Sequence, residues 1–191
     1  WTKLEEITSS IFNSASSTPM DELFTRYMYF LRAKQGIRTS NVEALRKFFE
    51  RDKYKYLKVD QTLNDLESLA NFWKSVNTQD VNRFSEPILK RLFVLNYAPN
   101  SIWEYITSVF FLARRDDDEN IDETSFLQFL DKITAFIFAY GITNPGLIAA
   151  RTPIFNEMIE IIQGNEVSFS KNRFNTHQDR QRITDYRFTN N

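Results

Sequence analysis

The chain has 191 residues, of which 42% are hydrophobic and 15% aromatic, and its formal net charge is -1. This length fits one domain, or two small helical lobes that share a core. The composition excludes a generally disordered chain and a strong overall attraction to nucleic acid or anionic membrane. The sequence holds no Cys and a single His, which excludes disulfides and thiolate metal sites and leaves few residues for catalysis.

No signal peptide opens the sequence, and no apolar run approaches the roughly 20 residues that span a bilayer. The nearest approach, residues 133–142, predicts a buried helix. Together with the absence of Cys, this favours a cytoplasmic protein without a membrane partner. Because the chain starts with Trp1 instead of Met, directly in an amphipathic pattern, we expect a piece of a longer polypeptide.

Apolar residues recur at helical spacing from the first residue onward. The first dozen residues predict a helix, followed by a polar linker. Thr18, Pro19 and Asp21 combine an N-cap, a proline in the first turn and an acid three residues after the cap, so a second helix is expected there. Gly36 is expected to end it, because glycine adopts the left-handed conformation that closes many helices.

The same kind of start signal at residues 40–43 predicts a shorter third helix that includes Phe48 and Phe49. Residues 53–58 alternate Lys and Tyr, which suggests a strand, but no partner strand is evident and we expect a loop. Residues 63–76 carry the apolar stripe of a long fourth helix.

The second half continues in the same way, with predicted helices over residues 85–95, 102–113 and 126–140, the last closed by Gly141. A final helix is expected to begin at residues 144–145 or 152–153 and to stop at Gly164. The pattern therefore predicts an all-α fold, a single bundle of about seven or eight helices over residues 1–164. We expect residues 165–191 to form a polar, mildly basic and mobile tail, or a linker to a following domain.

Motifs for nucleotide or hydrolytic chemistry are missing from the sequence. Neither G-x-x-x-x-G-K nor G-x-G-x-x-G occurs, and a Ser-His-Asp or HEXXH site would depend on His177, which lies in the polar tail. An exposed tail residue is the favoured interpretation of His177. We expect no catalytic residue and no cofactor.

One dense group of carboxylates occupies residues 116–119, with Asp122 and Glu123 just beyond. Such oxygen ligands suit Mg²⁺ or Ca²⁺, but the spacing is not that of a calcium loop and no Gly supplies its turn. The favoured interpretation is an acidic loop whose charges stabilise the N-terminus of the next helix, so no metal site is expected. Arg114 and Arg115 are expected to pair with these acids or with the end of the preceding helix.

The predicted tail contains five basic residues interleaved with aromatic ones, a pattern that can follow a nucleic-acid backbone. These candidate weak nucleic-acid contacts are Lys171, Arg173, Arg180, Arg182 and Arg187. Because the tail also holds three acids, a linker to a following domain is the favoured alternative.

Residues 22–53, 63–76, 88–110 and 126–142, taken in this order after an opening Trp helix, resemble a known family. Their markers are a helix with Phe24 and Tyr27, a second with Phe48, and the break at residues 97–99. Over about residues 1–162 the chain resembles the helical middle region of GmrSD-type restriction proteins, modification-dependent bacterial enzymes that cleave foreign DNA. In that family a ParB-like domain handles nucleotide and an HNH-type domain cuts DNA.

The chemical motifs of that family are absent, since there is no D-G-Q-Q-R stretch and one His cannot supply an H-N-H site. The resemblance therefore implies a non-catalytic module that positions or relays between the flanking domains of the same polypeptide and touches DNA weakly. The alternatives are a free-standing helical scaffold that binds a partner protein, and a small-molecule enzyme that uses the acidic loop.

Overall fold

The computed structural model describes residues 1–12, 17–143 and 147–169. Within these residues the chain forms eight α-helices and one 3₁₀ turn and has no strand, which confirms the predicted all-α fold. The helices are α1 (Thr2–Ile11), α2 (Pro19–Lys34), α3 (Leu45–Tyr54), α4 (Asp60–Asn77), α5 (Glu86–Leu95), α6 (Ile102–Arg114), α7 (Glu123–Thr143) and α8 (Leu147–Ile162), with the 3₁₀ turn η1 (Lys55–Lys58) between α3 and α4.

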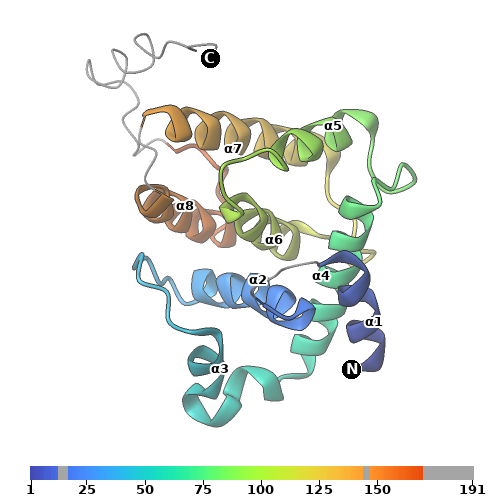
Figure 1. Ribbon diagram of the computed structural model, residues 1–191, viewed down its shortest axis with the longest axis vertical. Coiled ribbons are helices and arrows are strands. Elements are labelled where there is room, and N and C mark those ends of the chain that lie inside the picture. Colours follow the sequence, from blue (N-terminus) through green and yellow to red (C-terminus); the bar gives the residue numbers. More distant parts are fainter. Residues whose placement is uncertain (13–16, 144–146, 170–191) are drawn as a thin grey trace.

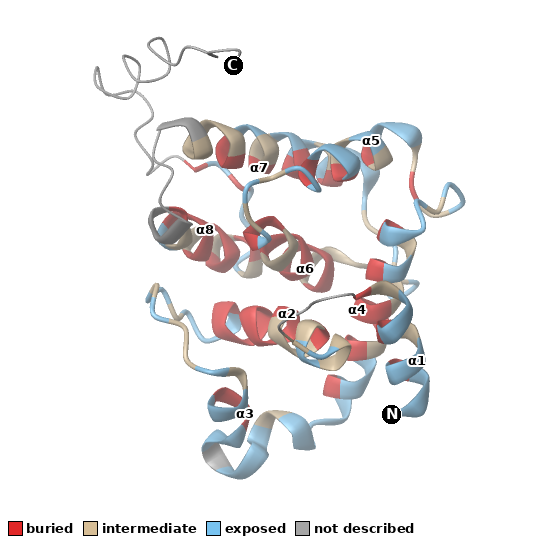
Figure 2. Ribbon diagram, viewed as in Figure 1, coloured by how far each residue is buried: buried red, intermediate tan, exposed pale blue. Residues whose placement is uncertain are grey.

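The helices stack in tiers along the long axis of the molecule (Figure 1). α7 packs with α5 at one end, α8 packs with α6 in the middle, and α2 packs with α1 and α4 below them, while α3 and η1 form the opposite end. α6 also contacts α2 and α4, and nine of its 13 residues are buried (Figure 2). None of the described helices is long and apolar enough to cross a bilayer.

The aromatic stripes form the core, as their spacing predicts. The rings of Phe72 and Phe111 stack with centroids 4.3 Å apart and join α4 to α6, and those of Phe110 and Phe129 stack at 4.2 Å and join α6 to α7. Offset stacking of buried rings adds to the free energy gained from burial alone.

Two of the predicted helix boundaries are confirmed. The backbone N–H of Asp21 donates to the Thr18 hydroxyl at 3.1 Å, and the Thr18 N–H donates to the Asp21 carboxylate at 3.3 Å, which completes a capping box at the start of α2. Gly36 follows α2 with a φ of 68°, the left-handed conformation expected of it.

The region between α2 and α4 differs from the prediction. The third helix begins at Leu45, because the preceding segment stays extended and Arg32 holds the backbone oxygen of Thr39 at 2.9 Å. Residues 53–58 are helical, since α3 runs to Tyr54 and η1 follows. Tyr56 of η1 turns back and stacks on Phe48 with ring centroids 5.5 Å apart, a contact that a solvated loop would not make.

The region around α7 and α8 also corrects two predictions. α7 continues through Gly141 to Thr143, so this glycine does not end the helix, and a Cβ there would meet the ring of Pro99 at 3.4 Å, an ordinary van der Waals contact. The described part of α8 begins at Leu147, so Pro153 lies inside the helix and the residues 144–145 named as a start lie outside the described residues.

The segment after α8 belongs to the helical body, whereas the sequence placed it in the tail. Val167 and Phe169 are buried, and the ring of Phe169 stacks on Phe136 at a centroid distance of 3.9 Å. The buried carboxylate of Glu157 accepts hydrogen bonds from the backbone N–H groups of Ser168 and Phe169, both at 2.9 Å. The body therefore extends at least five residues past Gly164, because Glu157 satisfies backbone donors that would otherwise be buried without a partner.

Candidate functional site

A pocket of about 450 Å³ opens between α1, α2, α4 and α6. Its lining is mainly polar and includes one cation, two carboxylates and two indole rings. The lining residues are Ile11, Phe12, Glu22, Arg26, Trp73, Asn77, Asn96, Ser101, Trp103 and Glu104.

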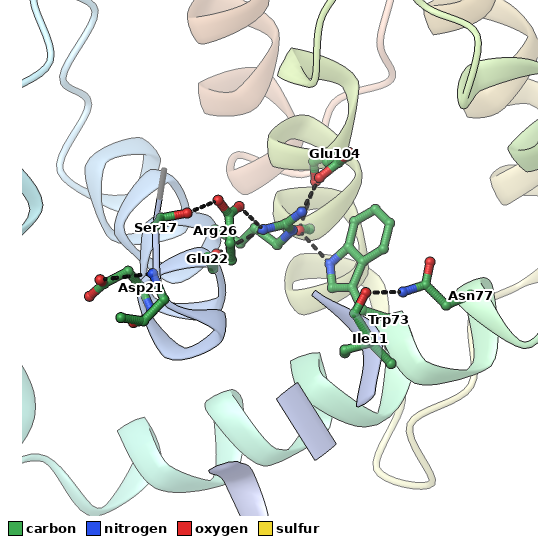
Figure 3. A network of polar contacts seen from close by, with 10 residues as sticks. Ile11, Ser17, Asp21, Glu22, Arg26, Trp73, Asn77 and Glu104 are labelled. Carbon is green, nitrogen blue, oxygen red and sulfur yellow. Dashed lines mark hydrogen bonds and ion pairs between the residues drawn. The ribbon is translucent and has the colours of Figure 1, made fainter. Parts of the chain in front are cut away.

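Arg26 is the central residue of this pocket, and only 4% of its side chain is exposed. Its Nη1 donates to the carboxylate of Glu22 and to the Glu22 backbone oxygen, both at 2.9 Å, which the i,i+4 spacing on α2 permits. Its Nη2 donates to the carboxylate of Glu104 on α6 (Figure 3). One guanidinium therefore bridges two carboxylates on two helices.

Aromatic rings also contact the Arg26 guanidinium, which lies 4.4 Å from the ring centroid of Phe12 and 5.2 Å from that of Trp73. The indole N–H of Trp73 donates to the hydroxyl of Ser108 at 2.9 Å, and this hydroxyl donates to the backbone oxygen of Glu104 at 2.7 Å. The cation is thus enclosed by rings, and cation–π attraction is strongest for such a desolvated charge.

The electrostatics of the pocket centre on Glu104. Burial raises the pKa of its carboxyl above the usual range, and the neighbouring charge of Arg26 opposes this shift in pKa. A carboxyl with a raised pKa can serve as a general acid, but Arg26 bonds both Glu104 and Glu22, and Ser17 donates a further hydrogen bond to Glu22. The arrangement ties α2 to α6 more directly than it equips them for proton transfer.

A second buried network joins α4 to the end of α6. Arg115 donates to the carboxylate of Asp65 at 2.6 Å, and the hydroxyl of Tyr27 donates to the same carboxylate at 3.2 Å. Burial raises the pKa of Tyr27 to about 12. The sequence-based pairing of the two arginines was wrong, because Arg115 binds Asp65 and Arg114 donates to the backbone oxygen of Asn165 at 2.8 Å.

The acidic residues 116–119 form a closed turn between α6 and α7. The N–H of Asn120 donates to the Asp116 carboxylate at 2.8 Å, and Glu119 turns inward, where it accepts hydrogen bonds from Ser68 at its carboxylate and from Arg83 at its backbone oxygen. Asp122 accepts the N–H of Ser125 at 2.8 Å and so caps α7. Within the described ranges, no group of three or more His, Asp or Glu side chains could hold a metal ion.

The residues that the sequence named as nucleic-acid contacts all lie between 170 and 191, outside the described residues, as does His177. Sequence reasoning missed Arg26, Glu104 and Asp65. The i,i+4 spacing of Glu22 and Arg26 was a visible signal for the ion pair between these two residues. Nothing in the sequence pairs Arg26 with Glu104, because these residues are 78 positions apart.

Comparison of the chain with known proteins finds no match to any family model, to any curated protein or to any solved structure.

Proposed function

We propose that this chain is a non-catalytic helical module of a cytoplasmic, multidomain DNA-restriction protein, in which it positions or relays between nucleotide-handling and nuclease domains. One observation carries the positioning role. The structure describes four charged side chains as buried, and each of them bonds to another residue: Arg26, Arg32, Asp65 and Glu157.

Catalytic sites leave charged groups available to a substrate, whereas these charges hold parts of the protein together. Arg26 joins α2 to α6, Asp65 joins α4 to the residue after α6, and Glu157 holds the segment after α8. Removing one partner of such a buried pair is strongly destabilising, so each pair favours a single arrangement of its two segments. A stiff body of this kind is suited to hold neighbours at a fixed separation.

The ends of the described body support the same role. The ring of Trp1 stacks on Phe24 of α2 at a centroid distance of 6.2 Å, while the ring of Phe169 stacks on Phe136 of α7, a helix in the tier at one end of the stack (Figure 1). Domains joined at these two points would therefore lie against different tiers of the stack. The resemblance of residues 1–162 to the helical region of GmrSD-type proteins supplies the restriction context.

Two experiments test this proposal. The purified chain, incubated with Mg²⁺ or Mn²⁺, ATP or GTP, and plain or modified plasmid, should neither hydrolyse nucleotide nor cut DNA. Turnover that disappears in the triple variant Asp116→Ala, Asp117→Ala, Asp118→Ala would overturn the non-catalytic assignment. The complete reading frame should encode a ParB-like segment before Trp1 and an HNH segment after Asn191, and a frame with neither would contradict the restriction context.

The positioning role itself is tested in that full-length protein. Inserting about twelve Gly and Ser residues immediately before Trp1 loosens the junction with the preceding domain, so phage restriction in a plating assay should fall. The same insertion at the exposed turn of residues 78–79 lengthens the chain equally without separating the module from its neighbour, and restriction should persist. Equal restriction by both insertion variants would contradict the positioning role.

A specific surface favours a second candidate, a free-standing scaffold that binds a partner protein. Phe93 and Tyr97 at the end of α5 are 48% and 70% exposed, and their rings contact each other at 5.3 Å. Exposed aromatic pairs often anchor protein interfaces. A photoreactive amino acid at position 97 should then give one discrete cross-linked product in cells, whereas the same probe at the equally exposed Val81 should not.

A further inference from the structure

The α3–η1 segment has an unusual charge for this protein. Residues 44–59 contain six Lys or Arg residues and two acids, while the other 175 residues contain 18 basic and 23 acidic residues. The chain as a whole is therefore slightly acidic, and this segment is its strongest local concentration of positive charge. Such asymmetry attracts and orients a polyanion, because the rest of the surface repels it.

Packing leaves this charge exposed to solvent. Phe48 and Phe49 are buried, and Phe49 meets Phe24 of α2 edge to face at 5.4 Å, so the opposite face of α3 points to solvent. All six basic residues are exposed: Arg46, Lys47, Arg51, Lys53, Lys55 and Lys58. We call this set, together with Tyr54, the α3 basic face.

Few acids neutralise the α3 basic face. Arg46 pairs with Glu50 at 3.3 Å, and Arg51 pairs with Glu43. Among the described residues, Lys47, Lys53 and Lys58 have no ion-pair partner. The ammonium group of Lys55 lies 5.9 Å from the ring of Tyr56 and pairs with no described carboxylate. Four ammonium groups are therefore available to phosphate oxygens.

Tyr54 adds an aromatic surface between these lysines. Its side chain is 49% exposed, and both Lys53 and Tyr54 adopt left-handed backbone conformations, with φ of 57° and 62°. Two consecutive non-glycine residues in this region are costly, and such strain persists only where the surrounding structure imposes it. The strained turn reverses the chain and leaves the tyrosine ring in solvent next to Lys53 and Lys55.

We infer that the α3 basic face binds the backbone of single-stranded nucleic acid without sequence preference, with phosphates on its lysines and a base stacked on Tyr54. Lysines interleaved with an exposed ring match the combination that such surfaces use. An acidic peptide or a membrane would use the charge but not the stacking surface. The choice of nucleic acid over other polyanions rests in part on the proposed function; the rest of the inference does not.

The test uses a fluorescent single-stranded DNA oligonucleotide and anisotropy titrations of the 191-residue chain between about 50 and 200 mM salt. The variant carries Lys47→Gln, Lys53→Gln, Lys55→Gln and Lys58→Gln together. Each lysine–phosphate pair that a substitution removes should make the slope of log K against log salt shallower by about 0.7. Because this variant removes all four lysines, we expect its affinity at low salt to fall at least about tenfold.

The matched control carries Lys3→Gln, Lys74→Gln, Lys90→Gln and Lys132→Gln, which changes the net charge equally but away from α3. It should bind within about twofold of the unaltered chain, since a global charge effect alone is small at these salt concentrations. Tyr54→Ala should weaken binding of the single strand by about five- to a hundredfold and binding of a duplex much less, because paired bases are not free to stack. Circular dichroism of each variant establishes that it is folded.

Three outcomes would overturn the inference. The first is the same affinity loss in the control as in the α3 variant. The second is full affinity in the α3 variant combined with loss of affinity when residues 170–191 are deleted, which would assign binding to the basic residues of that segment. The third is binding to phosphatidylserine vesicles but not to the oligonucleotide. None of these results bears on nuclease inertness or phage restriction, which test the proposed function separately.

Discussion

The guanidinium of Arg26 and the carboxylate of Glu104 form an ion pair between α2 and α6, across 78 positions of the sequence. Arg26 is almost wholly buried, while Glu104 lies at the wall of the pocket. The pair joins two helices of the middle tiers.

Replacing Arg26 by Met should strongly destabilise the protein. Glu104 and Glu22 would then lie close together without their shared cation, and breaking a buried pair in this way costs about 3–5 kcal/mol. Urea unfolding followed by circular dichroism measures the loss. Arg46→Met is the control, because Arg46 is 89% exposed in its pair with Glu50 and its loss should cost less than about 1 kcal/mol. Similar losses for both variants would contradict a central role for Arg26.

Glu104→Gln should change how stability depends on pH. Because the pKa of Glu104 is raised in the folded protein, the native state binds more protons than the unfolded state at pH values just above the ordinary Glu pKa of 4.5. The contribution of Glu104 to stability is therefore present below pH 4.5 and is lost as pH rises through the folded pKa. Relative to Glu104→Gln, the unaltered protein should lose stability over that window. A difference between the two unfolding free energies that does not change with pH would contradict this assignment.

Tyr27→Phe should alter stability in alkaline solution. Burial raises the pKa of Tyr27 to about 12, so the folded protein keeps this proton between pH 10 and 12 while the unfolded chain releases it. The free energy of unfolding then falls as pH rises, by at most about 1.4 kcal/mol per pH unit for this group. Removing the hydroxyl should make this decline shallower, as denaturant unfolding at pH 10 and 11 would show. An unchanged slope in Tyr27→Phe would contradict the raised pKa.

Truncation should locate the end of the folded body. A chain ending at residue 169 should be as stable as the full chain, whereas one ending at residue 164 loses the Phe136–Phe169 stack and leaves Glu157 without its two backbone donors. Deleting one buried aromatic ring alone costs about 3–5 kcal/mol. Thermal unfolding of the two truncated chains gives the comparison, and Phe169→Ala in the full chain should reproduce most of the loss. Equal stability of the two truncated chains would return residues 165–169 to the tail.

Glycine at the strained turn should have an effect opposite to its usual one. At Lys53, where φ is 57°, Lys53→Gly relieves strain and should stabilise the protein by about 1 kcal/mol or leave its stability unchanged. Lys47→Gly, in the regular part of α3, should destabilise it by about 1 kcal/mol. Chemical denaturation of both variants distinguishes these effects, and destabilisation by Lys53→Gly would argue against the left-handed turn.

Local signals were sufficient to predict most of the helices. Apolar stripes at a spacing of 3.6 residues marked the buried face of each, and the Thr18 capping box acted within one turn, where sequence and structure are directly related. Gly141 shows the limit of such signals. Its place near the end of an apolar stripe suggested a stop, but α7 continues to Thr143, because Gly141 does not adopt the left-handed conformation with which Gly36 follows α2.

The candidate site was harder to predict than the helices, because it depends more on tertiary contacts. Arg114 and Arg115 were assigned to the adjacent acids because those acids are near in sequence, yet Asp65 on α4 is the partner of Arg115. Val167 and Phe169 were assigned to the tail because the residues around them are polar, yet Glu157 on α8 holds the backbone of residues 168 and 169, and the ring of Phe169 stacks on Phe136 of α7. Pairing between charged residues that are distant in the sequence depends on how the helices pack, and it produces no periodic pattern in the sequence.

The hydrogen bonds from the backbone of residues 168 and 169 to Glu157 also determine how the body would respond to mechanical load. Tension on the chain beyond residue 169 would meet two parallel hydrogen bonds and the stacked ring of Phe169 before it could peel residues 165–167 from the surface. The pull would therefore be shared between α8, which carries Glu157, and α7, which carries Phe136, and α8 would pass it on to α6 and α2. Load that reaches residue 169 would then act on these helices as a unit, before any of residues 165–167 separates from the body.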